Sequence, residues 1–135
     1  MKKITFDIMS TDGYDLCVAR STDRIKDGSD VMFTDSEPVT FVYEYPLSHK
    51  VNIVHIRKNG KWTRKAIGRI IQKDYAMIYA EEDGAVGVTA DIPGTFNRGR
   101  SAGPHGIWGH GIGDLVIEGV TYDAKTHKVA LSIGS

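Results

Sequence analysis

Apolar and polar residues alternate along several short stretches of the chain, and this period of two predicts β-strands. The clearest pair covers 39–45 and 51–56, which a loop at 46–50 should join as a hairpin. A second pair, 115–122 and 128–133, is separated by a short turn and predicts a terminal hairpin. Shorter extended stretches earlier in the chain are expected at 4–8, 16–19 and 31–33.

One segment has a different period and predicts an amphipathic helix over about 64–82. Its apolar residues recur at steps of three and four and so share one face: Ile67, Ile70, Ile71, Tyr75 and Ile78. Thr63 is suited to cap the start of this helix, and Gly84 to end it with a left-handed turn. Gly68 lies inside it, which marks either the close approach of another backbone or a ligand, or a tolerated loss of helix propensity.

Strands before and after a single long helix favour an α+β class with a mostly antiparallel sheet of short strands. The chain has 135 residues, of which 41% are hydrophobic. That is enough for one core and too little for two, so we expect a single domain over 1–135.

Charge and cysteine content limit the partners and the compartment. Seventeen Lys and Arg residues balance seventeen Asp and Glu residues, which argues against binding to duplex nucleic acid and permits assembly into a homo-oligomer. The single cysteine excludes an internal disulfide framework and fits a reducing compartment. No apolar run is long enough for a signal or a membrane span. We therefore expect a cytoplasmic protein with no membrane partner and no cofactor.

Nine of the fifteen glycines fall between 84 and 113, which predicts a long Gly-rich loop. Its second half carries residues suited to an anion pocket. Arg98 and Arg100 offer planar donors for phosphate, with Asn97 beside them, while Trp108 could form a wall. His105 and His110 can exchange protons near neutral pH, with Asp114 as their acidic partner. The expected ligand is small, anionic, phosphate-bearing and nucleotide-like.

The charges at the two ends of the helix oppose its dipole. Arg64 and Lys65 lie at the positive end, where an incoming anion would explain them, although selection for solubility explains them equally well. Glu81, Glu82 and Asp83 lie at the negative end, where a solvated surface is favoured over a cation site. The hypothesis is that the ligand binds between the Gly-rich loop and the start of the helix.

Two other functions stay open. The loop could instead dock onto another chain, because Trp and Arg are favoured at interfaces, and the protein would then be a non-catalytic interaction or self-assembling domain. A His/Asp metal-dependent hydrolase is the third candidate, but the spacing of His105, His110 and Asp114 matches no compact zinc motif, so no metal ligand is assigned. Whether the ligand is cleaved or only held is also open. His55 and His127 are expected to be structural or exposed.

Three pieces of the sequence together resemble a small domain family of uncharacterised activity: Tyr45–His49, Thr63–Glu82 and Gly106–Val120. The resemblance covers roughly the last ninety residues and implies that the helix and the Gly-rich loop act as one unit. It supplies no activity, cofactor or catalytic residue. In the family an acidic residue often follows the histidine of the Gly-Ile-Trp-Gly-His motif, whereas this chain has Gly111, which weakens a His-Asp catalytic interpretation.

Overall fold

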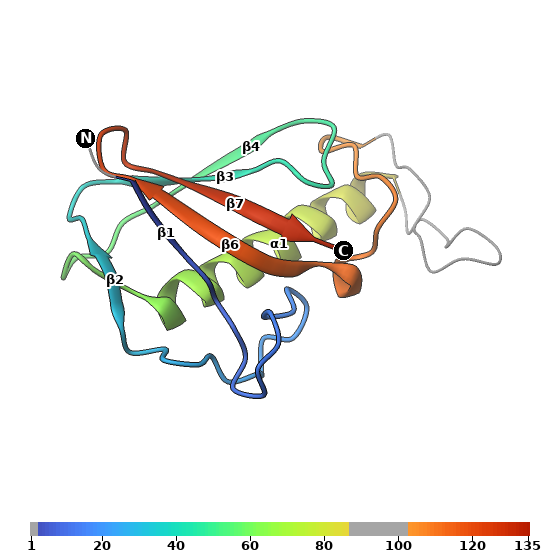
Figure 1. Cartoon of the computed structure of the whole chain (residues 1–135). Helices are drawn as coiled ribbons and strands as arrows, with labels where there is room; N and C mark the ends of the chain where they lie inside the picture. Colours follow the sequence, from blue (N-terminus) through green and yellow to red (C-terminus); the bar gives the residue numbers. More distant parts are fainter. Residues whose placement is uncertain (1–2, 87–102) are drawn as a thin grey trace.

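The computed structural model describes residues 3–86 and 103–135. A five-stranded sheet and one long helix, α1 (Arg64–Val86), dominate the fold (Figure 1). Across the sheet the strands are β1 (Lys3–Phe6), β6 (Val116–Asp123), β7 (Lys128–Gly134), β3 (Val39–Tyr43) and β4 (Val51–His55). A two-stranded sheet of β2 (Val31–Thr34) and β5 (Lys61–Thr63) lies before α1, and a short 3-10 helix, η1 (Ile112–Asp114), lies before β6.

The α+β class and the mostly antiparallel sheet are confirmed. Antiparallel pairing joins β1 to β6, β6 to β7 and β3 to β4, whereas β3 and β7 run parallel. Both predicted hairpins form: β3 and β4 pair from Val39 opposite His55 to Tyr43 opposite Val51, and β6 and β7 pair across a turn at 124–127.

Three details differ from the sequence prediction. The stretch 16–19 is not a strand, since Cys17 makes only an isolated bridge to Val116. The residues 61–63 form β5, a strand that the sequence analysis did not predict. The helix continues past Gly84 to Val86, because Gly84 is not among the glycines that adopt a left-handed conformation.

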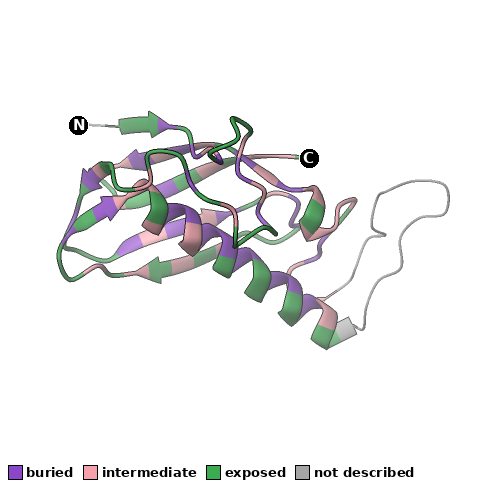
Figure 2. Ribbon diagram, turned by 90° about the horizontal axis from the view of Figure 1, so that it is seen from below, coloured by how far each residue is buried: buried purple, intermediate pink, exposed green. Residues whose placement is uncertain are grey.

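The core lies between α1 and one face of the sheet. Figure 2 shows that the buried positions of α1 face the strands and the exposed positions face away from them. Four of the five predicted stripe residues, Ile67, Ile71, Tyr75 and Ile78, are fully buried, and Ile70 is partly buried against the core. The strand residues Val39, Phe41 and Tyr43 are fully buried as well. Within the described ranges, no helix combines the length and apolar character that a membrane span requires.

The segment between β1 and β2 packs across the N-terminal half of α1, where Gly68 has no side chain. A Cβ added at Gly68 would lie 2.8 Å from the Ile25 Cδ1 atom, 3.3 Å from Ile8 and 3.4 Å from Leu16. The glycine inside the helix therefore marks a close approach, but by core side chains and not by the backbone or ligand that the sequence analysis considered.

Alanine substitutions at the two helical glycines should have opposite effects. Gly84→Ala should stabilise the protein by up to about 1 kcal/mol, because alanine is the better helix former and its Cβ would meet nothing within 4 Å. Gly68→Ala gains the same propensity but overpacks the core, which typically costs about 1–3 kcal/mol. Urea unfolding should rank Gly84→Ala above Gly68→Ala by about 1–3 kcal/mol, and equal stabilities would show that the packing at Gly68 is loose.

Candidate functional site

The first turn of α1 has its backbone donors occupied by the protein itself. The amide of Arg64 donates to the carbonyl of Asp30 at 3.0 Å, and the amide of Lys65 donates to the carbonyl of Gly28 at 2.9 Å. The amide of Ala66 donates to the Thr63 hydroxyl at 3.1 Å, which confirms Thr63 as the cap. These N–H groups are therefore not open to a ligand, contrary to what the position of the basic residues suggested.

Arg64, predicted to bind the ligand, is held by two acidic residues. Its Nε donates to the Asp7 carbonyl at 2.8 Å, and its two terminal nitrogens lie 3.1 Å from the Asp7 carboxylate and 3.4 Å from that of Asp30. Only 14% of the Arg64 side chain is exposed. These two carboxylates lie where the helix dipole favours negative charge, so an internal ion pair explains the basic residue.

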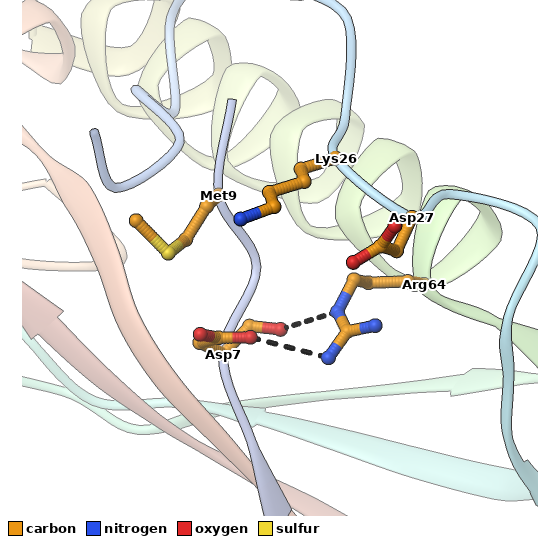
Figure 3. Close-up of a pocket in the computed structure, with 5 residues that line it drawn as sticks. All are labelled: Asp7, Met9, Lys26, Asp27 and Arg64. Atoms are coloured by element: carbon orange, nitrogen blue, oxygen red, sulfur yellow. Dashed lines mark hydrogen bonds and ion pairs between the residues drawn. The ribbon is translucent and has the colours of Figure 1, made fainter. Parts of the chain in front are cut away.

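A small cavity of about 60 Å³ lies beside this ion pair and is lined by Asp7, Met9, Lys26, Asp27 and Arg64. In Figure 3, Arg64 extends toward Asp7, while Lys26 and Asp27 come from the segment that crosses the helix start. Two cationic and two anionic side chains balance each other, and the volume suits a few water molecules. This cavity is no anion site.

A larger pocket of about 470 Å³ is lined by other residues of the same segment and of the helix start, and we call it the basic pocket. The residues that line it are Thr11, Arg24, Ile25, Gly28, Ser29, Thr63, Lys65 and Arg69. Three of these side chains are cationic and three carry hydroxyls, and none of the described residues that line it is acidic. In a chain with no net charge, this is a local concentration of positive charge and hydrogen-bond donors.

Buried hydrogen bonds fix part of the basic pocket in place. The guanidinium of Arg69 donates to the Gln72 side-chain oxygen at 2.8 Å and also to the Asp23 carbonyl. Gln72 is 3% exposed, and its amide nitrogen donates to the carbonyls of Cys17 and Arg20 at 3.0 Å. The pocket wall and one of its cations are thus positioned before any ligand arrives, which reduces the entropic cost of binding.

The opposite end of α1 holds the residues that follow the undescribed part of the chain. Glu82 is fully buried and accepts backbone hydrogen bonds from Gly103 at 3.0 Å, His105 at 2.8 Å and Ile107 at 3.4 Å. The His105 ring lies 3.0 Å from the Glu81 carboxylate. Glu82 therefore organises the segment 103–107, and the solvated surface expected at this end of the helix is wrong for Glu82.

His110, Trp108 and Asp114 meet beside Tyr45 rather than beside His105. The Trp108 ring packs edge-on against Tyr45 with centroids 5.4 Å apart, and the His110 ring lies 5.8 Å from Tyr45 and 6.4 Å from Trp108. The His110 Nδ1 atom lies 3.8 Å from the Asp114 carboxylate. Trp108 remains 40% exposed, so it borders the surface.

The residues predicted to share one pocket thus lie at two ends of α1. Glu81, the partner of His105, lies sixteen positions after Lys65 in the helix, which corresponds to about 24 Å along the axis. Lys65 lines the basic pocket, whereas His105 and His110 contact Glu81 and Tyr79 in the C-terminal part of the helix, with Trp108 and Asp114 beside His110. Asn97, Arg98 and Arg100, with most of the Gly-rich loop, lie outside the described residues.

Sequence reasoning missed two buried aspartates that each hold a tyrosine and a histidine. Asp74 accepts from the Tyr43 hydroxyl at 2.5 Å and lies 2.7 Å from His55. Burial, followed by the charge of Asp74, raises the pKa of Tyr43 far above its usual range. The sequence does contain a signal for Asp74. It is three residues from Ile71 and four from Ile78, and so it falls on the apolar face of the helix.

Asp35, which lies between β2 and β3 in the chain, has the same kind of environment. It accepts from the Tyr122 hydroxyl at 2.5 Å, and it lies 2.6 Å from the His127 Nδ1 atom. Burial alone would raise the pKa of Asp35, but the hydrogen bonds from Tyr122 and His127 outweigh it and hold the pKa below the ordinary 3.8. Both histidines contribute to structure here, as the sequence predicted.

Among the residues that the structure describes, no group of three His, Cys, Asp or Glu side chains could hold a metal ion. Comparison with protein-family models, with curated proteins and with solved structures gave no match. The resemblance to a domain family therefore depends on the sequence motifs alone, and the function must be argued from the geometry of the protein.

Proposed function

We propose that this protein binds a small phosphate-bearing anion in the basic pocket. The observation that supports this most is the charge of the lining: Arg24, Lys65 and Arg69 all line the pocket, with no acidic residue among the described lining residues. Guanidinium and ammonium groups are the side chains that proteins use to bind phosphate oxygens. The volume of about 470 Å³ falls within the usual range for small-molecule sites and suits a ligand of nucleotide size.

The proposal keeps the predicted ligand class and changes the residues that bind it. Lys65 remains a ligand-binding residue, and Arg24 and Arg69 join it, while the Arg64 guanidinium stays with Asp7 and Asp30. The hydroxyls of Thr11, Ser29 and Thr63 supply further hydrogen bonds to phosphate oxygens. Because His105 and His110 lie at the far end of α1, the proposal assigns binding and no cleavage at this pocket.

Charge reversal at Lys65 should weaken binding about tenfold or more, since a charge-assisted hydrogen bond contributes about 1.5–3 kcal/mol and the new carboxylate repels the ligand. The measurement is isothermal titration calorimetry of ADP, inorganic pyrophosphate and a sugar phosphate with wild type and Lys65→Glu. The matched control is Lys73→Glu, which makes the same charge change at an exposed position of the same helix. It should bind like the wild type.

The outcomes separate the candidate functions. Equal weakening by both variants would show that net charge, and not the basic pocket, attracts the anion. If none of these phosphate compounds binds, the proposal fails, and the interaction domain becomes the better candidate. Val54 and Ile56, which are 57% and 63% exposed at and just beyond the edge strand β4, favour that second function.

A further inference from the structure

Three segments that are distant in the sequence place a serine, a histidine and an aspartate in line near the C-terminal end of α1. Ser135 follows β7, His110 precedes η1, and Asp114 is the last residue of η1. The Ser135 hydroxyl lies 3.3 Å from His110 Nε2, and the Asp114 carboxylate lies 3.8 Å from His110 Nδ1. The Tyr45 hydroxyl lies 2.9 Å from the Ser135 hydroxyl.

Each nitrogen of His110 faces the group that acyl transfer requires. The ring nitrogen that would take a proton faces the serine, and the other faces a carboxylate that can orient the ring and stabilise its charged form. Both distances exceed ideal hydrogen bonds, as is common in catalytic sites before substrate tightens them. We infer that Ser135 and His110 are catalytic residues of a carboxylic ester hydrolase and that Asp114 is a positioning residue.

The aromatic residues beside this serine indicate which esters would bind. Trp108 is 40% exposed and packs edge-on against Tyr45, whose hydroxyl contacts Ser135. Flat apolar side chains with one exposed surface bind aromatic groups by stacking. The substrate class is therefore an ester with an aromatic acyl or leaving group.

The reaction needs no reactant besides the ester and water. The Ser135 oxygen forms a bond to the carbonyl carbon while its proton passes to His110 Nε2. The ester C–O bond then breaks, and His110 returns the proton to the departing oxygen, which leaves as an alcohol or phenol. Water attacks the resulting acyl-serine with His110 again as base, and the carboxylic acid and free serine are released.

This site is separate from the basic pocket. The Tyr79 hydroxyl donates to the His110 carbonyl at 2.8 Å, and Tyr79 lies about 21 Å along α1 from Lys65. If no phosphate compound binds in the basic pocket, the proposed ester hydrolase site is not affected. The reverse also holds, since Lys65→Glu should not change ester hydrolysis.

The test combines covalent labelling with hydrolysis by the full-length protein. Diisopropyl fluorophosphate should add one diisopropylphosphoryl group, which peptide mapping by mass spectrometry should place on Ser135. Hydrolysis of 4-nitrophenyl benzoate should exceed the buffer rate and fall to that rate in Ser135→Ala. Ser132→Ala is the matched control, because it removes another exposed hydroxyl from the end of the same strand and should keep full activity. Labelling elsewhere, no labelling, or equal rates for Ser135→Ala and wild type would each overturn the assignment.

The positioning role of Asp114 is tested by measuring its effects on kcat and on KM separately. Asp114→Asn should lower kcat at least tenfold and leave KM for the same ester unchanged, because the carboxylate orients His110 and does not contact substrate. Asp114→Glu should recover part of the loss. A change confined to KM would contradict the positioning role.

Discussion

Replacing Glu82 with alanine is expected to lower the free energy of unfolding by about 3–5 kcal/mol. The Glu82 carboxylate is fully buried and accepts hydrogen bonds from the backbone amides of Gly103, His105 and Ile107. Without it, the buried amide of Ile107 and the partly buried amides of Gly103 and His105 lose this acceptor, and a buried unpaired donor costs about 1–3 kcal/mol. Urea unfolding followed by circular dichroism measures the difference.

Glu81→Ala is the matched control for this prediction. Glu81 is the preceding residue of the helix, its side chain is 54% exposed, and it pairs with the His105 ring. An exposed ion pair contributes less than about 1 kcal/mol, so this variant should remain close to wild type. Similar losses for both variants would show that Glu82 does not hold the segment 103–107.

Asp35→Asn should destabilise the protein by about 2–3 kcal/mol at neutral pH, because hydrogen bonds to a charged acceptor are stronger than those to an amide. The carboxylate accepts from Tyr122 and lies within hydrogen-bonding distance of His127, and it also accepts from the amide of Glu37 at 2.9 Å. The side-chain amide of asparagine has one oxygen that accepts hydrogen bonds, whereas the Asp35 carboxylate has two. Urea unfolding at pH 7 gives this value.

The same variant should reveal how Asp35 links stability to pH. Its pKa in the folded protein is held below the ordinary 3.8, so the unfolded chain takes up the proton more readily. The stabilisation is complete above about pH 5, declines as the pH approaches the ordinary pKa of Asp, and is lost as the pH falls through the folded pKa. The difference between wild type and Asp35→Asn should therefore shrink between pH 5 and pH 3, at about the ordinary pKa of Asp. Glu37→Gln, an exposed position nearby, should leave the pH dependence of unfolding unchanged, and a constant difference for Asp35→Asn would contradict the assignment.

Much of the fold followed from periodicity, because local pattern determines which face of an element is buried. The stripe of isoleucines predicted α1, and alternation predicted β3, β4, β6 and β7. β5 was missed, since its three residues are too few to display a period. The wrong strand at 16–19 is apolar because Leu16 and Val18 enter the core from an irregular segment.

The candidate site was harder to predict because its parts come together only in three dimensions. The sequence drew attention to Lys65, but Arg24 and Arg69 join it only because the segment after β1 crosses the helix at Gly68. Arg64 looked equally available, and its carboxylate partners Asp7 and Asp30 are 57 and 34 residues away. Long-range ion pairs of this kind leave no local pattern.

The charged residues at the two ends of α1 are also balanced by groups that the sequence alone does not reveal. Basic residues at its start and acidic residues at its end oppose the dipole, and an external ligand was a reasonable explanation at the start. The structure instead supplies Asp7 and Asp30 at one end and the backbone amides of 103–107 at the other. Only Lys65, of the two predicted residues at the helix start, remains available for a ligand.

The central claim is that a phosphate-bearing anion binds in the basic pocket, and nuclear magnetic resonance tests it most directly. In a titration of ¹⁵N-labelled protein with inorganic pyrophosphate, the amides of residues 24–29 and 63–69 should shift and reach saturation together. The absence of any saturable shift, or shifts confined to residues 103–114, would contradict the account.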